Sequence, residues 1–157
     1  MNDAEKIGKI LLEKNYKIST VESCTGGLLS SKLTDISGSS AYITLNLVTY
    51  SNEAKMAILK VAPQTLNNQG AVSEECAYEM AKGLYNLTKS EICVSTTGIA
   101  GPTGGSTQKP VGLMYSTIYT PNRYEIYKIK INPDLSRIEI KESFTKEVLK
   151  KIYNFLI

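Results

Sequence analysis

Three short segments of the chain bring together residues that could carry out chemistry. They are Glu22–Gly27 (ESCTGG), Tyr50–Lys55 (YSNEAK) and the glycine-rich run Thr97–Gly105 (TGIAGPTGG). The 157 residues include no histidine, so a serine or cysteine nucleophile cannot rely on the usual imidazole base. A lysine whose amine is neutral can take that role. The residue types therefore favour a serine nucleophile with a lysine base.

The first segment contains two candidate nucleophiles. It follows an expected strand and opens an expected helix, so an oxyanion forming at Ser23 would lie beside the N–H groups of residues 25–27 (Thr25, Gly26 and Gly27). Cys24 is the rival nucleophile, although such a cysteine is more often a buried packing residue. A simpler interpretation also stays open, in which Ser23 or Thr25 only caps the helix.

The second segment contains the candidate base. If Ser51 caps the following helix, Lys55 falls near its first turn, where the helix dipole disfavours a positive charge and lowers the pKa of a lysine. Burial would lower that pKa further. The alternative is an ordinary surface lysine paired with a nearby glutamate.

The third segment contains four glycines, Gly98, Gly101, Gly104 and Gly105, next to hydroxyl side chains. It matches neither the phosphate loop that ends in G-K-[ST] nor the dinucleotide-binding fingerprint. Its backbone N–H groups could still form a concave site for a phosphate. The alternative is a flexible surface loop.

The elements that must position these segments alternate between strands and helices. Strands are expected at 17–22, 42–50, 91–97, 112–119 and 124–131, and helices at 3–15, 26–34, 52–59, 74–87 and from 134 onward. A hairpin turn at 120–123 joins the last two strands. This order predicts a layered α/β domain over residues 1–157, with a mixed, mainly parallel sheet. Ligands bind at the carboxyl ends of strands in such sheets, so the three segments should form one pocket.

Composition argues against several other classes of protein. Hydrophobic residues make up 42% of the chain and charged residues 21%, as in ordinary globular domains. The 18 basic and 15 acidic residues are mixed and leave a net charge of +3, so we expect no nucleic-acid partner. The three cysteines lack the spacing of a disulfide scaffold or a zinc site and favour a cytoplasmic location. No apolar run approaches the roughly 20 residues of a membrane-spanning helix, and the N-terminus does not resemble a signal peptide.

Five motifs, taken in order along the chain, resemble the CinA C-terminal domain family. They are ESCTGG at 22–27, DI-x-GSS at 35–40, VTYSNEAK at 48–55, GAVSE at 70–74 and TGIAGP-x-GG at 97–105. The resemblance covers about residues 5–155. It implies a three-layer α/β/α fold and a nicotinamide-nucleotide amidase of pyridine nucleotide recycling. Such an enzyme hydrolyses nicotinamide mononucleotide to nicotinic acid mononucleotide and ammonia, without a metal or an organic cofactor.

The same motifs imply roles for individual residues. The resemblance makes Ser23 the nucleophile and Lys55 the base. The supporting residues that it implies are Tyr50, Ser40, Thr97 and Glu22, the last of which would orient the lysine or bind substrate. The expected ligands of the 5′-phosphate are Ser39, Ser40 and the loop Gly98–Gly105.

The resemblance also leaves alternatives open. Leu47 stands where relatives often have glycine, and Thr103 stands where they often have an acidic residue. Relatives form dimers, which makes a homodimer a candidate assembly, but the aromatic residues of the last helix (Phe144, Tyr153 and Phe155) are more often core than interface residues. A second function remains open: a nucleotide-binding or competence- and damage-associated regulatory module that uses the same pocket without chemistry.

Overall fold

The computed structural model describes all 157 residues and is built around one five-stranded sheet. Its strands are β1 (Ile18–Glu22), β2 (Ile43–Val48), β3 (Ile92–Gly98), β4 (Leu113–Tyr119) and β5 (Tyr124–Lys130). Their order across the sheet is β2-β1-β3-β4-β5. β1 runs parallel to both of its neighbours, β2 and β3, whereas β4 runs antiparallel to β3 and β5.

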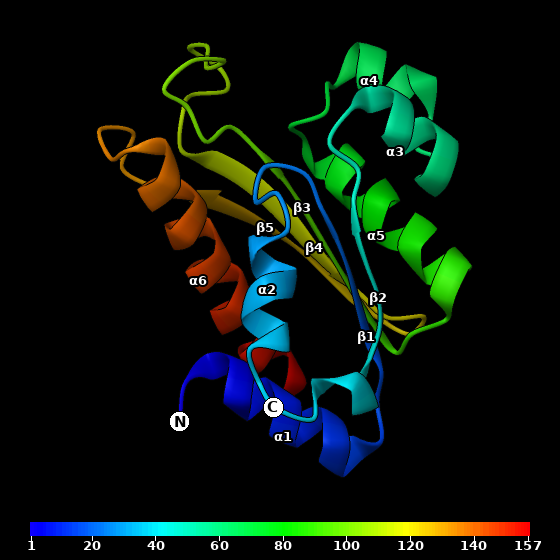
Figure 1. Ribbon diagram of the computed structural model, residues 1–157. Coiled ribbons are helices and arrows are strands. Elements are labelled where there is room, and N and C mark those ends of the chain that lie inside the picture. Colours follow the sequence, from blue (N-terminus) through cyan, green and yellow to red (C-terminus); the bar gives the residue numbers. More distant parts are fainter.

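Helices cover both faces of this sheet (Figure 1). The helices on one face are α1 (Asp3–Lys14), α2 (Leu28–Thr34) and α6 (Arg137–Leu156). Those on the other face are α3 (Asn52–Leu59), α4 (Pro63–Asn68) and α5 (Glu74–Thr88). The larger hydrophobic core includes Ile7, Leu29 and Phe144, and the smaller core includes Leu59 and Met80. The expected three-layer α/β/α fold is confirmed.

The sheet itself is less parallel than the sequence predicted. Two strand pairs are parallel and two are antiparallel, so the sheet is evenly mixed. The reason lies after β3, where the connection at 99–112 contains no helix. Without a helical crossover the chain returns in the opposite direction, and the next strand pairs antiparallel.

Each expected strand and helix is present within a few residues of its predicted bounds, and two short elements were missed. These are α4 and the 3-10 helix at Ser39–Ala41. The last helix begins at Arg137 rather than Asp134, because Ser136 is its N-cap. The Ser136 hydroxyl accepts from the Glu139 N–H and the Glu139 carboxylate accepts from the Ser136 N–H, which forms a capping box.

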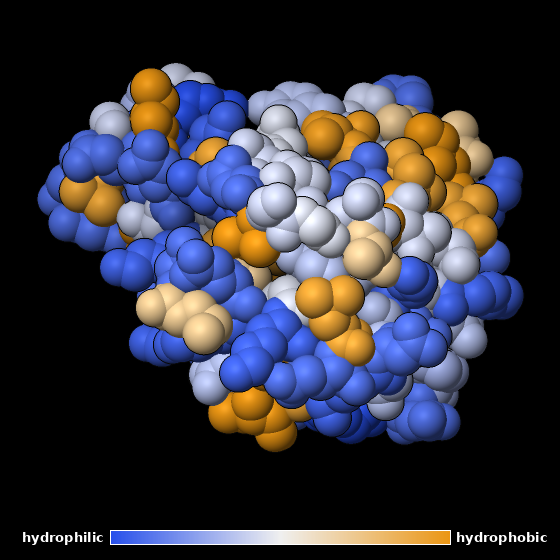
Figure 2. Space-filling model, turned by 60° about the horizontal axis from the view of Figure 1, so that its bottom comes forward, coloured by the Kyte–Doolittle hydropathy of each residue, from blue (hydrophilic) through white to orange (hydrophobic).

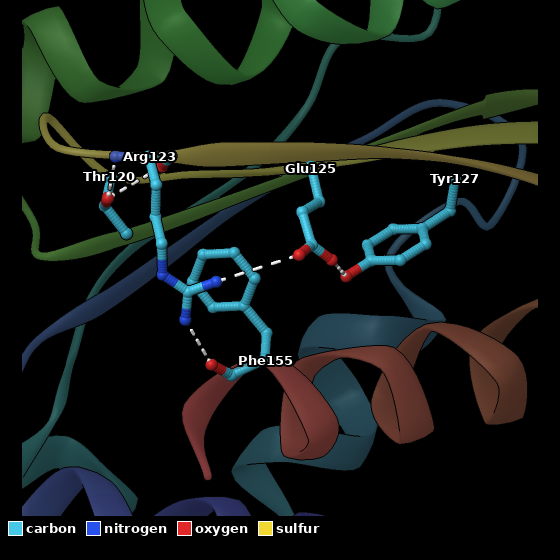
Figure 3. A network of polar contacts seen from close by, with 5 residues as sticks. All are labelled: Thr120, Arg123, Glu125, Tyr127 and Phe155. Carbon is cyan, nitrogen blue, oxygen red and sulfur yellow. Dashed lines mark hydrogen bonds and ion pairs between the residues drawn. The ribbon is translucent and has the colours of Figure 1, made fainter.

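The predicted hairpin is present and is tied to the end of α6 (Figure 3). The Thr120 hydroxyl accepts from the Arg123 N–H at 2.9 Å. The Arg123 guanidinium lies 3.6 Å from the ring centroid of Phe155 and donates to the Phe155 carbonyl at 2.5 Å. Glu125 accepts from the Tyr127 hydroxyl and lies 3.8 Å from the Arg123 guanidinium. These contacts fasten the hairpin to the helix at the end of the sheet opposite to the carboxyl ends of β1 and β3.

The aromatic residues of α6 pack inward, as their residue types favoured. Phe144 and Phe155 belong to the larger core, and Tyr153 packs against it.

On the face shown in Figure 2, hydrophobic side chains lie in separate groups among hydrophilic ones. None of the six helices is both long and apolar enough to cross a lipid bilayer.

The carboxyl ends of the three parallel strands lie at one edge of the sheet, toward the top of Figure 1. Glu22, the last residue of β1, is in register with Val48, the last residue of β2. The segments that follow these strands, together with the loop after β3, therefore meet at this edge. This is the arrangement that the sequence predicted.

The position of α3 depends on a close contact with α5. Gly83 of α5 faces the carbonyl of Leu59, and a Cβ at Gly83 would collide with that carbonyl oxygen. Leu59 ends α3, one helical turn after Lys55. A side chain at position 83 would therefore push away the helix that carries the lysine.

We expect Gly83→Ala to lower the free energy of unfolding by about 1–3 kcal/mol, because it overpacks a backbone contact. Chemical denaturation measures this change. Asn86→Ala, at an exposed position of the same helix, is the control and should leave stability unchanged or slightly raised. Equal stability of Gly83→Ala and the parent protein would contradict the proposed contact.

Candidate active site

Ser23 and Lys55 lie side by side at the carboxyl ends of the parallel strands. Ser23 directly follows β1, and Lys55 is the fourth residue of α3, whose N-cap Ser51 accepts from the Ala54 N–H. The Lys55 Nζ lies 3.1 Å from the Ser23 Oγ. The lysine is 1% exposed and the serine 9%. Two residues that are 32 positions apart in sequence are thus within hydrogen-bonding distance in a buried place.

The surroundings of the lysine suit a neutral amine. Its Nζ also donates to the Thr49 carbonyl at 2.8 Å and to the Tyr50 carbonyl at 3.3 Å. A neutral amine has two N–H groups and one lone pair. If the two carbonyls take the two N–H groups, the lone pair faces the Ser23 hydroxyl. The amine could then accept the hydroxyl proton.

Burial lowers the pKa of Lys55 below its ordinary value of 10.5. The only groups that oppose this shift are the thiols of Cys76 and Cys24. Burial raises the pKa of these thiols to about 11 and about 12, so they are uncharged at neutral pH and cannot support a lysine cation. The helix position that the sequence suggested is present, and desolvation is the main cause of the shift.

Cys24 is poorly suited to be the nucleophile. Its side chain is 6% exposed, and burial raises the pKa of its thiol to about 12. A thiol reacts as the thiolate, which is scarce at neutral pH when the pKa is this high. The arrangement therefore favours the Ser23 hydroxyl over the Cys24 thiol.

Glu22 does not orient the lysine or face the cavity, which corrects the expectation from sequence. Its carboxylate is fully buried and accepts from the backbone N–H groups of Gly27, Leu29 and Ser30 at 3.2, 2.9 and 3.0 Å. It also accepts from the hydroxyls of Thr25 and Ser30 at 2.5 and 2.6 Å. The first turn of α2 has unpaired N–H groups that need acceptors, and Glu22 satisfies them.

The same contacts decide which N–H groups remain for an oxyanion. The Gly26 N–H donates to the Ser23 carbonyl at 3.0 Å, and the Gly27 N–H donates to Glu22. Both groups are occupied, so two of the three expected oxyanion donors are ruled out by their contacts. The N–H groups of Cys24 and Thr25 have no acceptor within the protein, and Cys24 lines the cavity beside Ser23.

Ser23 and Lys55 open into a cavity of about 270 Å³. Its walls come from the segments after β1, β2 and β3, from the turn before α5 and from the start of α6. The lining residues are Ser23, Cys24, Tyr50, Asn52, Lys55, Ala71, Val72, Thr97, Gly98, Ile99, Ala100, Gly101, Thr103, Gly104 and Arg137. This set contains two basic residues and no carboxylate, so the cavity favours an anionic ligand.

Two of the four expected supporting residues, Tyr50 and Thr97, line this cavity. Thr97 is buried, and its hydroxyl donates to the Ala71 carbonyl at 2.8 Å, which fixes the turn before α5. Tyr50 is exposed, and its hydroxyl accepts from the Arg137 guanidinium at 3.1 Å. Of the loop glycines, Gly105 is the exception because it packs against Val111 and does not line the cavity.

Ser39 and Ser40 lie far from the cavity of the same chain. They form the 3-10 helix that precedes β2, at the bottom of Figure 1 beside α1. The six residues of β2 separate this end of the strand from Tyr50 by about 20 Å at 3.3 Å per residue. Their expected role as phosphate ligands or supporting residues is therefore wrong within one chain, since the motif precedes the strand whereas the cavity follows it.

Arg137 is the main cavity residue that the sequence did not reveal. It is the first residue of α6, and its guanidinium donates to the Gly101 carbonyl at 2.6 Å as well as to Tyr50. It lies 87 positions from Tyr50 in sequence, in a segment without a motif. Its capping box marks the helix start, but only the fold shows that this start faces the cavity.

The fold and the cavity define an α/β protein with a buried lysine beside a serine at the carboxyl ends of its parallel strands. The model of the CinA C-terminal domain matches residues 2–156. The chain therefore belongs to the CinA C-terminal domain family.

Curated relatives agree with this assignment. The chain is 47% identical over 137 residues to a competence-damage inducible protein of Caldanaerobacter subterraneus subsp. tengcongensis, a match that covers 87% of this chain and 33% of the relative. It is 42% identical to a protein of the same description from Caldicellulosiruptor saccharolyticus, over 98% of this chain and 37% of the relative. The chain thus spans about a third of the length of these relatives.

Solved structures of the family have the same fold over nearly the whole chain. The competence/damage inducible protein CihA from Agrobacterium tumefaciens is 36% identical with a TM-score of 0.88, covering 97% of this chain and 94% of that one. The competence or damage-inducible protein from Enterobacter asburiae is 28% identical with a TM-score of 0.93, covering 99% and 96%.

The burial of Lys55 predicts how stability depends on pH. The folded state lowers the pKa of this lysine, so between the folded pKa and the unfolded pKa the unfolded chain binds more protons and stability rises with pH. Below the folded pKa, the cost of burying the ammonium is fully present.

We therefore expect the stability of the parent protein, relative to Lys55→Met, to rise from pH 7 to pH 10. Thermal unfolding of both proteins at the two pH values measures this difference. Lys9→Met removes an exposed lysine of α1 and should show no such trend. If the difference in stability between the parent protein and Lys55→Met were the same at both pH values, a lowered pKa of Lys55 would be contradicted.

Proposed function

We propose that this chain is an amidohydrolase that deamidates nicotinamide mononucleotide with Ser23 as nucleophile and Lys55 as general base. The observation that carries the proposal is the 3.1 Å contact between the Ser23 Oγ and the amine of a lysine that is 1% exposed. Membership of the CinA C-terminal domain family supports it. The resemblance of the motifs supplies the substrate.

In the first step, the Ser23 Oγ attacks the carboxamide carbon while its proton passes to the Lys55 amine. The amide carbonyl becomes an oxyanion, for which the N–H group of Cys24, at the cavity wall and without an acceptor in the protein, is the available donor. The lysine ammonium then returns the proton to the nitrogen that leaves as ammonia. An acyl-enzyme on Ser23 remains.

In the second step, Lys55 takes a proton from a water molecule that attacks the acyl carbon. The second tetrahedral species collapses, the C–O bond to Ser23 breaks, and the lysine returns the proton to the serine oxygen. Nicotinic acid mononucleotide is released. The Thr49 and Tyr50 carbonyls hold the amine in place throughout, because they bind its N–H groups.

The phosphate of the substrate matches the charge of the cavity. Arg137 supplies a guanidinium at the rim, and a guanidinium binds phosphate oxygens with two parallel hydrogen bonds. The loop after β3 supplies free backbone donors, since the N–H groups of Ala100, Gly101, Thr103 and Gly104 have no acceptor within the protein. Cation and free amides together form a site of the kind that binds phosphate.

The proposal predicts ammonia release from nicotinamide mononucleotide that depends on both residues. Ser23→Ala and Lys55→Met should each lower kcat by about 10³-fold or more, as loss of a nucleophile or its base does in such enzymes. The rate should rise with pH as Lys55 loses its proton, at a pH below the ordinary lysine value of 10.5. A coupled ammonia assay measures both effects.

Cys24→Ala is the matched control for Ser23→Ala and should keep most of the activity. Loss of activity in Cys24→Ala with retention in Ser23→Ala would instead assign the nucleophile to the thiol. A folded parent protein that binds nucleotides but releases no ammonia would favour the non-catalytic binding module. Release from a different amide only would keep the chemistry and change the substrate.

The phosphate site makes a separate prediction. Arg137→Met should raise KM for nicotinamide mononucleotide about tenfold or more, since a hydrogen bond to a charged group contributes about 1.5–3 kcal/mol. Turnover of nicotinamide riboside, which lacks the phosphate, should be slow and unaffected by this change. Lys128→Met, at an exposed position of β5, is the control. Equal effects of Arg137→Met on both substrates would rule out a phosphate contact.

A further inference from the structure

A chain of four buried groups connects the backbone of Ser23 to the Glu22 carboxylate. The Ser23 N–H lies 3.3 Å from the Thr96 Oγ1 and 3.1 Å from the Thr96 carbonyl oxygen. The Thr96 Oγ1 lies 2.9 Å from the Thr25 Oγ1, which donates to Glu22 at 2.5 Å. The side chains of Glu22, Thr25 and Thr96 are completely buried.

The direction of every hydrogen bond in this chain follows from the carboxylate. A carboxylate only accepts, so the Thr25 hydrogen points to Glu22. Thr25 has no second hydrogen, so in its contact with Thr96 the donor is Thr96. The Thr96 oxygen is then left as an acceptor and faces the Ser23 N–H. With these directions the hydrogen bonds that join Glu22, Thr25, Thr96 and Ser23 are all satisfied at once.

We propose that Thr96 is a positioning residue for the nucleophile. Its hydroxyl, oriented through Thr25 by Glu22, holds the Ser23 N–H so that the Ser23 Oγ stays 3.1 Å from the Lys55 Nζ. The inference rests on the proposed function only in taking Ser23 as the nucleophile.

The sheet provides a matched control for this residue. Thr117 lies on β4, is also completely buried, and its hydroxyl has no hydrogen-bond partner. At either position, Thr→Val replaces the hydroxyl by a methyl group of similar size. Only at position 96 does the change remove an acceptor from the Ser23 N–H, which is then left with the Thr96 carbonyl oxygen alone.

The test compares Thr96→Val, Thr96→Ser, Thr25→Val and Thr117→Val with the parent protein. One readout is ammonia release from nicotinamide mononucleotide, and the other is the rate at which a fluorophosphonate probe phosphonylates Ser23. We expect Thr96→Val to lower kcat and the labelling rate about 10- to 100-fold, because small displacements of a nucleophile have effects of this size. KM and the pH at which activity rises should stay unchanged, since neither the phosphate site nor Lys55 is altered.

Thr25→Val should act in the same direction, because it breaks the chain one step further from Ser23 and keeps the backbone N–H at residue 25. Thr96→Ser should restore the rates, and Thr117→Val should not change them. The inference is overturned if Thr96→Val reacts as fast as Thr117→Val. It is also overturned if Thr96→Ser and Thr117→Val are both slowed as much as Thr96→Val. If the parent protein is labelled but releases no ammonia, and Thr96→Val still slows labelling selectively, the proposed substrate fails while the positioning role stands.

Discussion

The burial of the Lys55 amine beside Ser23 is the constraint on which the rest of the site depends. An ammonium in this place has a large desolvation cost, and no carboxylate lines the cavity to offset it. The lysine is held instead by the carbonyls of Thr49 and Tyr50, which come from the segment between β2 and α3. The Thr49 N–H of that segment donates to the Glu22 carbonyl at 2.9 Å, and α3 must stay in contact with α5 through Gly83 to keep the amine in position.

A second buried ionisable residue, Glu22, lies next to the nucleophile in sequence and has a different task. Glu22 accepts five hydrogen bonds, chiefly from the first turn of α2. It connects the end of β1 to the start of α2 across the tight turn that carries Ser23. The nucleophile is thus fixed from two directions, by the amine that faces its Oγ and by the hydroxyls that connect its backbone to the carboxylate. Since Glu22 uses the helix N–H groups, the site for an oxyanion moves from the helix start to the turn itself.

Sequence and structure agreed where a local pattern was sufficient. Hydrophobic periodicity and capping residues placed every strand and five of the six α-helices, and the positions of the three motifs at strand ends predicted their meeting. The two short elements were missed because α4 has six residues and the 3-10 helix three, too few for a periodic pattern. The roles of Glu22, Gly105 and Ser39–Ser40 could not be read from the motifs, because a motif shows which residues are together in sequence and not which way they face.

The amino-acid sequence alone fixes which chemistry is available: it has no histidine, a serine before a pair of glycines, a lysine near an expected helix start and a glycine-rich loop. These depend on residue type and short-range spacing. The tertiary structure alone decided that the lysine is desolvated, that Arg137 joins the cavity from α6 and that Thr96 contacts the backbone of Ser23. Each of these depends on packing between elements that are 32 to 87 residues apart, and desolvation is a property of the packed interior that no single segment carries.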